Sequence, residues 1–250
     1  MWELNISIGN ERADALRGIE NRLRPYVAPG GGIMILDRLK DRSYLSIACD
    51  EGEKAALVNE LKEAVGDVIT VQFKQHYLLR HSRLPKGNKI NYNAFIRALV
   101  AFDREWDREL VLKNLRLQNE LLLDGFFNFR LKELKAKWQE VCDLASNNSG
   151  YLEYHDTFVE LLAFLVKTID GKTDSVFIAK DGAEYLFYGA DGKPLDRLKL
   201  GIDKAITDET LLPNLINLAP KEVFLTDGAI PEYIKNLMNC IFKVNIRIES

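Results

Sequence analysis

The stretch EVFLTDGAIPEYIKNLMNCIFKVNIRI, residues 222–248, predicts the architecture of the C-terminal part of this chain. Glu222–Leu225 has the apolar character of a buried strand, Pro231–Ile241 predicts a helix with proline in its first turn, and Val244–Ile248 predicts a final strand. A strand, a crossover helix and a second strand normally form a right-handed unit with parallel strands. We therefore expect a βαβ unit at this end of the chain.

The residues before this unit predict a hairpin and two helices. Val176–Ala179 and Glu184–Tyr188 have strand character and flank the turn signal Lys180-Asp181-Gly182, which favours a β-hairpin. Asp208–Leu218 predicts a helix that opens with two acidic residues. Tyr154–Ile169 is so apolar that it predicts a helix buried nearly all round.

The middle of the chain predicts helices. Asp67–Arg83 fits helical spacing, although Ile69–Phe73 within it also alternates like a strand, and we favour the helix. A second helix is predicted over Tyr92–Lys113, with Phe95, Leu99, Phe102 and Trp106 on one buried stripe, and a third over Leu121–Ala145, with a buried face of Phe127, Leu131, Leu134, Trp138 and Val141.

The N-terminal part predicts a small module. Leu4–Ile8 alternates as a half-buried strand, Glu11–Tyr26 has helical spacing, Ile33–Leu36 and Ser43–Cys49 predict two further strands, and a helix is predicted from Glu51. The whole chain is therefore predicted to be α+β, with a small N-terminal α/β unit, a helical middle, and a C-terminal mixed sheet that contains the hairpin and the βαβ unit.

Two domains are expected, with a boundary after residue 66. Residues 1–66 form the small module, and residues 67–250 share one core. The reason is that the apolar segment Tyr154–Val166 needs cover on more than one side, which the stripe of Phe127, Leu131, Leu134 and Trp138 offers.

Composition excludes several classes of protein. The net charge is −3, from 34 basic and 37 acidic residues, so no overall charge favours nucleic acid as a partner, although a local basic patch is compatible with it. The three cysteines are widely spaced, which favours a reducing compartment and three small buried side chains. Without a signal-like N-terminus or an apolar run long enough to span a membrane, the chain is expected to be soluble and cytoplasmic.

No metal, cofactor or catalytic group is expected. His76 and His81 are five residues apart and do not share a helical face well, so a solvated basic face explains them better than a metal site. His155 beside Asp156 is typical of a helix start. The sequence also has no recognisable catalytic motif.

One segment is not explained by amphipathic periodicity. Residues 124–132, DGFFNFRLK, place three phenylalanines, an amide and two cations within about two helical turns. This segment resembles the central segment of sporulation proteins of the YtxC-like family, which occur in endospore-forming bacteria. Residues 211–225, LLPNLINLAPKEVFL, are similar to the closing helix-Ala-Pro-strand unit of that family, and the resemblance runs in order from about Asn91 to the C-terminus. The hairpin ends in Tyr188-Gly189-Ala190 instead of an acidic segment, which is a departure from the family pattern.

The resemblance implies a cytosolic sporulation protein and no particular reaction. Our hypothesis is a non-enzymatic protein with a partner-binding or structural role. The expected partner is a protein, with nucleic acid as the alternative, and the contact patch is Asn128, Arg130 and Lys132. A structural alternative pairs Arg130 with a nearby acid such as Glu133, or with an acid on an adjacent helix, so that it holds the helices in register. The alternative function is a small-ligand-binding or catalytic protein that uses a cleft at the carboxyl ends of the parallel strands, where Asp227 and Gly228 follow Leu225.

Overall fold

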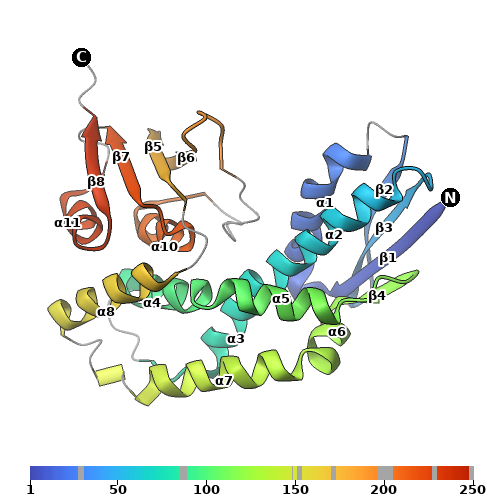
Figure 1. The fold of residues 1–250 in the computed structure, drawn as a ribbon, viewed down its shortest axis with the longest axis horizontal. Helices are drawn as coiled ribbons and strands as arrows, with labels where there is room; N and C mark the ends of the chain where they lie inside the picture. The colour runs from blue at the N-terminus through green and yellow to red at the C-terminus, as the bar shows by residue number, and fades with distance from the viewer. Residues whose placement is uncertain are drawn as a thin grey trace. The chain divides into compact units, whose positions relative to one another are not determined.

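The computed structural model of the protein describes residues 1–27, 31–84, 89–147, 149–150, 154–169, 173–195, 205–226 and 230–247. The chain divides into two compact units. Unit 1 comprises Met1–Phe73 and Trp106–Lys137, and unit 2 comprises Lys74–Glu105 and Trp138–Ser250. Figure 1 shows that each unit contains its own β-sheet.

Unit 1 combines an N-terminal sheet with helices from two parts of the chain. Its elements are β1 (Trp2–Gly9), a 3-10 turn (Asn10–Arg12), α1 (Ala13–Val27), β2 (Ile33–Leu39), β3 (Arg42–Cys49), α2 (Lys54–Asp67), a π-helical segment (Val68–Phe73), most of α5 (Arg104–Asn114), β4 (Glu120–Leu122), α6 (Leu123–Arg130) and the start of α7 (Lys132–Asn147).

The sheet of unit 1 has the strand order β2-β3-β1-β4. The predicted order of strand, helix, strand, strand and helix in the first 66 residues is confirmed, although α2 begins at Lys54 and not at Glu51. The prediction that a helix starts at Leu121 is wrong. Glu120, Leu121 and Leu122 form β4, which pairs in parallel with β1, where Ile6 is the partner of Leu121. The free edge of β1 supplies the backbone partners that turn this short apolar run into a strand.

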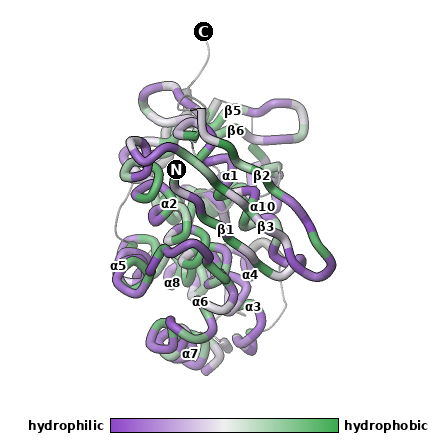
Figure 2. Tube along the Cα trace, turned by 90° about the vertical axis from the view of Figure 1, so that its right-hand side faces the viewer, coloured by the Kyte–Doolittle hydropathy of each residue, from purple (hydrophilic) through white to green (hydrophobic). Residues whose placement is uncertain are grey.

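The core of unit 1 lies between one face of this sheet and α1. Helix α1 packs against β1, β2 and β3. Along β3 buried residues alternate with half-buried ones, as a strand with one covered face requires. Figure 2 shows the same alternation of hydropathy along β1 and β3. The buried side chains of this face include Leu4, Ile6, Ile8, Leu45 and Ile47 from the sheet and Leu16, Ile19 and Leu23 from α1.

A buried ion-pair network joins the helices of unit 1. The carboxylate of Asp67, at the end of α2, is 2% exposed and accepts hydrogen bonds from Arg22 of α1 at 2.5 Å and from Arg108 of α5 at 2.6 Å. Arg22 also pairs with Glu60, and Arg108 pairs with Glu63. The network therefore ties α5, far along the chain, to the N-terminal helices.

The nearby carboxylates compensate for the burial of the two arginines of this network. Burial lowers the pKa of Arg108, and the positive charge of Arg22 adds to that effect. Burial alone would also lower the pKa of Arg22, but Glu60 and Asp67 raise it. Asp67 thus holds two like charges at a site with little access to solvent.

The predicted helix over Asp67–Arg83 is confirmed, and the strand alternative is wrong. Val68–Phe73 is π-helical and continues into α3 (Lys74–His81). Val68, Ile69, Thr70 and Val71 are all buried in succession, whereas a half-buried strand would expose every second residue.

The predicted single helix over Tyr92–Lys113 is wrong, because the structure has α4 (Lys89–Ala101) and α5. The chain turns at Asp103, which has a positive φ of 53° that a continuous helix does not allow. Trp106, expected on the buried stripe, is exposed, and the Lys137 ammonium lies 3.7 Å from the centre of its ring. The predicted third helix is also split, into α6 and α7.

Unit 2 contains the C-terminal sheet and the helices around it. Its elements are α3, α4, most of α7, α8 (His155–Thr168), β5 (Ser175–Asp181), β6 (Glu184–Tyr188), α10 (Asp208–Leu218), β7 (Glu222–Thr226), α11 (Glu232–Ile241) and β8 (Lys243–Arg247).

The sheet of unit 2 confirms the predicted hairpin and βαβ unit. Its strand order is β6-β5-β7-β8. β5 and β6 are antiparallel, and Gly182 in their turn has a φ of +60°, which suits glycine. β5, β7 and β8 are parallel neighbours, with α11 between β7 and β8 along the chain. The predicted α+β class, with N-terminal strands, a helical middle and a C-terminal mixed sheet, is confirmed.

Helix α8 is less buried than the sequence predicts. Phe158, Leu162 and Val166 are buried, whereas Phe164 is 61% exposed, so the expectation of nearly complete burial is wrong. The helix packs against α4 and α11, which cover one face of it. The further cover expected from the stripe of Phe127, Leu131, Leu134 and Trp138 stays a prediction.

The expected domain boundary after residue 66, with one core over residues 67–250, stays a prediction. Residues 106–137 cluster with the N-terminal strands, and α4 clusters with the C-terminal sheet. Which stretches fold cooperatively stays a prediction. Within the described ranges, no helix is long and apolar enough to cross a membrane.

The cysteines differ in exposure. Cys49 and Cys142 are buried as predicted, but Cys240 is exposed, so the expectation of three buried thiols is wrong. Burial, with a smaller effect of Asp143, raises the pKa of Cys142 to about 11, and burial also raises the pKa of Cys49. At about pH 8 only about one Cys142 side chain in a thousand would be the reactive thiolate even if it were accessible.

We therefore expect the native protein to show one fast-reacting thiol out of three. Titration with Ellman's reagent near pH 8 should label Cys240 quickly. Concentrated guanidinium chloride should expose the other two thiols, Cys49 and Cys142, to the reagent. Cys240→Ser should remove the fast phase of labelling and reduce the number of thiols that react in the denatured protein by one. Fast labelling of Cys142 in the native state would contradict its burial.

Candidate functional site

Helix α6 carries most of the unusual DGFFNFRLK segment and is firmly anchored in unit 1. Its buried side chains are Leu123, Phe126 and Phe127. The ring of Phe127 meets that of Phe73 edge-on, with 5.0 Å between the ring centres. These contacts explain two of the three phenylalanines as core residues.

An ion pair fixes the start of α6 to the sheet. Asp124 accepts two hydrogen bonds from the guanidinium of Arg42 in β3, at 2.8 and 3.1 Å, and a third from the backbone N–H of Gly125 at 2.9 Å. Burial alone would raise the pKa of Asp124, but the hydrogen bonds and charge of Arg42 hold it below its usual value. The pair therefore stabilises the fold above the pKa of an unfolded aspartate, and that contribution is lost as the pH falls through the lowered pKa.

The end of α6 is fixed as well. The backbone of Leu131 leaves the helical region, with φ −107° and ψ 43°, so α6 stops and α7 begins. The ammonium of Lys135 donates a hydrogen bond to the carbonyl oxygen of Asn128 at 2.8 Å and lies 5.6 Å from the centre of the Phe127 ring. This cation satisfies one of the carbonyls that a helix end leaves open.

The residues of the predicted contact patch all lie at this helix end. Asn128, Arg130 and Lys132 are exposed, and Phe129 between them is 73% exposed. We call these four residues the α6 patch. In one continuous helix Asn128 and Lys132 would be neighbours four residues apart, but the helix breaks between them at Leu131.

Arg130 has no structural ion pair among the described residues. The expected alternative, a pair with Glu133, is therefore not found. Sequence reasoning missed Phe129, although a signal for it exists. Phe127 and Phe129 are two residues apart, about 200° around a helix, so burying one directs the other away from the core.

Comparison with known families matches this part of the chain. A model of the YtxC-like family covers residues 100–246, which is more than half of the protein. The chain belongs to the YtxC-like family. The region that the YtxC-like family model covers includes the α6 patch and the C-terminal sheet except for Arg247, the last residue of β8, and it excludes β1, β2 and β3. No curated protein and no solved structure matched the chain.

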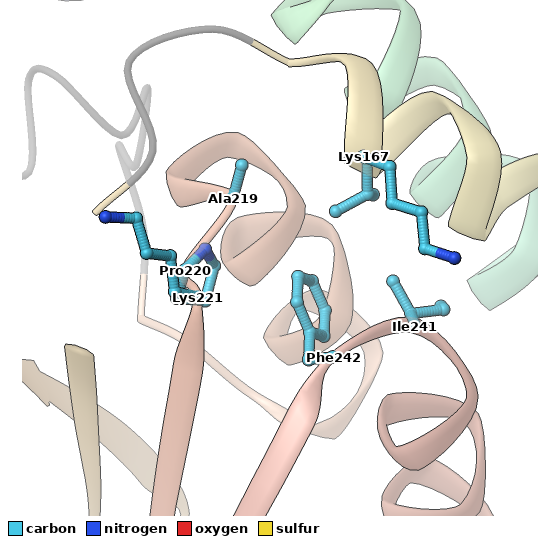
Figure 3. Close-up of a pocket in the computed structure, with 7 residues that line it drawn as sticks. Lys167, Ala219, Pro220, Lys221, Ile241 and Phe242 are labelled. Atoms are coloured by element: carbon cyan, nitrogen blue, oxygen red, sulfur yellow. The ribbon is translucent and has the colours of Figure 1, made fainter. Parts of the chain in front are cut away.

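The YtxC-like region also contains a small cavity within unit 2, shown in Figure 3. It has a volume of about 260 Å³ and lies where α8, the segment before β7 and the end of α11 meet. The lining residues are Val166, Lys167, Ala219, Pro220, Lys221, Ile241 and Phe242. The ammonium of Lys221 pairs with Asp174 at 2.5 Å, so part of its charge is already neutralised.

This cavity is not the cleft that the sequence suggested. It adjoins Lys221, directly before β7 begins, whereas the expected cleft follows the other end of that strand. Asp227 and Gly228, the residues expected there, lie outside the described residues. The alternative ligand site at Asp227 stays a prediction.

His81, expected on a solvated basic helix face, is exposed and contacts Tyr77. His81 stacks on Tyr77, with 4.0 Å between ring centres, and its Nδ1 lies 2.8 Å from the carbonyl oxygen of Tyr77. Over the part of the chain that the structure describes, no group of three or more His, Cys, Asp or Glu residues is placed to hold a metal ion.

A buried lysine in unit 2 has a structural role that the sequence did not suggest. Lys74 is 1% exposed, and its ammonium donates a hydrogen bond to the carbonyl oxygen of Phe102 at 2.6 Å. It also lies 6.0 Å from the centre of the Trp138 ring. The lysine thereby joins α3 to the carbonyl end of α4.

Proposed function

We propose that this YtxC-like protein is a non-catalytic, cytoplasmic protein that binds a protein partner during spore formation, and that the α6 patch is its contact surface. The exposure of Phe129 beside Arg130 on a well-anchored helix is the observation that carries this proposal. The link to spore formation rests on the family.

The anchoring of α6 supports a binding role for the patch. A binding surface is most effective when it is rigid, because less entropy is lost when the partner docks. The Arg42–Asp124 pair holds the start of α6, and Lys135 holds its end. Phe129 is therefore presented on a fixed base and not on a loose segment.

The chemistry of the patch fits a protein interface. Aromatic and arginine side chains dominate the binding energy of such interfaces. Burying an exposed phenylalanine is worth about 1.5–3 kcal/mol, and Arg130 and Lys132 add two cations around it. A partner with an apolar pocket rimmed by carboxylates would complement this surface.

We expect Phe129→Ser and Arg130→Glu each to weaken partner binding by about tenfold or more while the stability of the protein changes by less than about 0.5 kcal/mol. The measurement is co-purification of the tagged protein from sporulating cells, quantified for each variant, together with thermal unfolding of the purified variants. Spore yield should fall in parallel with binding.

Leu144→Ser is the matched control, because Leu144 is also a large apolar residue, 64% exposed, on the neighbouring helix α7. It should leave co-purification and spore yield unchanged. A partner that is retained equally by all three variants would contradict the role of the patch. A lowered melting temperature of Arg130→Glu would assign that residue a structural role.

A further inference from the structure

The edge strands of the two sheets are β6 and β8 in unit 2 and β2 and β4 in unit 1. β8 has five residues. In unit 2 the outer side of β6 is occupied by the chain itself, since the N–H of Tyr185 donates to the carbonyl of Ile206 at 2.8 Å and the N–H of Leu195 donates to the carbonyl of Phe187 at 3.0 Å. In unit 1 the edge strand β4 has three residues, whereas the edge strand β2 has seven. Among the described residues, β2 pairs with β3 on one side, and no backbone hydrogen bond is found on the other side of β2.

The side chains of β2 are unusually apolar for such an edge. Ile33, Ile35 and Leu39 are each more than half exposed and fall on alternate positions of the strand, so they share one face. Their neighbours on β3 are small or polar, as in the register pairs Ile33–Ala48 and Ile35–Ser46. Figure 2 shows the hydrophobic first half of β2. A long, apolar and unpaired edge is a site at which another strand can add to a sheet.

The charge on this face favours one kind of strand. Asp37 shares the face with Ile35 and Leu39, is exposed, and accepts the N–H of Arg38 at 2.7 Å with one carboxylate oxygen. A second copy of β2 added antiparallel would place residues of this same face opposite each other. Asp37 would then meet an apolar side chain or another Asp37, because that face of β2 carries no cation.

We propose that β2 receives an extended strand of a partner protein, with apolar side chains opposite Ile33 and Ile35 and a lysine or arginine opposite Asp37. Backbone hydrogen bonds along the edge provide affinity, and the side chains at alternate positions provide specificity for the sequence of the added strand. This surface is separate from the α6 patch, since it lies on an edge strand and not at the end of a helix, and it is outside the region that the family model covers.

The test uses the full chain and two short fluorescent peptides of alternating valine and threonine. One peptide carries a lysine at the position that meets Asp37, and the other carries a glutamate there. In fluorescence anisotropy the lysine peptide should bind about fivefold more tightly than the glutamate peptide. Asp37→Lys should reverse that preference, and Ile35→Ser should weaken both peptides.

Each other outcome overturns the proposal. The first is that neither peptide binds. The second is that Asp37→Lys still binds the lysine peptide more tightly than the glutamate peptide. The third is concentration-dependent self-association in sedimentation that Ile35→Ser abolishes, which would identify a second copy of the chain as the occupant of the edge. Circular dichroism confirms that each variant is folded, as expected for exposed positions. Phe129→Ser should bind the peptides as the unaltered protein does, so failure of this proposal and failure of the α6 patch are distinguishable.

Discussion

Asp67→Ala should destabilise the protein by about 3–5 kcal/mol, because it leaves two poorly solvated arginines facing each other without the carboxylate between them. Asp67 is 2% exposed and bonds to both Arg22 and Arg108. Glu60 and Glu63 remain as partners of these arginines, but neither replaces the shared position of Asp67. The measurement is the free energy of unfolding from urea titration followed by circular dichroism.

A second aspartate provides the matched control. Asp14 pairs with Arg17 at 3.5 Å on the surface of α1, where both side chains are more than two thirds exposed. Exposed pairs contribute little, so Asp14→Ala should change stability by less than about 0.5 kcal/mol. Equal effects of the two substitutions would show that the network around Asp67 is no stronger than a surface ion pair.

Leu162→Asp should unfold the region from Tyr92 to the C-terminus, because it buries a charge that has no partner. Leu162 is fully buried in α8, which packs against α4 and α11. The loss of apolar burial and the burial of a carboxylate together cost more than about 4 kcal/mol. Thermal unfolding followed by circular dichroism should show the loss of the cooperative transition of this region.

Phe164 lies two residues further along the same helix and is 61% exposed, so Phe164→Asp should leave the transition within about 0.5 kcal/mol of its original position. The same argument predicts that a fragment starting near residue 151 does not fold alone. Such a fragment lacks α4, which packs against both α8 and α10. If this fragment unfolds cooperatively on its own, the prediction that it shares a core with the preceding helices is wrong.

The sequence reveals elements whose formation depends on neighbours along the chain. The hairpin of β5 and β6 follows from a turn between two strand-like runs, and the βαβ unit follows from the order of strand, helix and strand near the C-terminus. Helix breaks are harder to predict from the sequence than the hairpin or the βαβ unit. Asp103 and Leu131 both interrupt predicted helices without a proline or glycine at the break, because the break depends on how the flanking helices pack.

The candidate site was only partly visible in the sequence. Asn128, Arg130 and Lys132 were singled out from an unusual composition, and all three are exposed. Phe129 was missed because a phenylalanine is assumed to belong to a core unless the helix face is worked out. The structural alternative, an ion pair of Arg130 with Glu133, is not found among the described residues.

By itself the sequence determined the α+β class, the order of most helices and strands, and membership of the YtxC-like family, because each depends on local periodicity, turn residues or motif. Only the tertiary structure decided that Leu121 and Leu122 form a strand and that Asp67 is buried between two arginines. It also decided that β2 is an apolar edge strand with no second strand beside it among the described residues. The physical reason is that these features arise from backbone and charge partners far away along the chain, which no local pattern encodes.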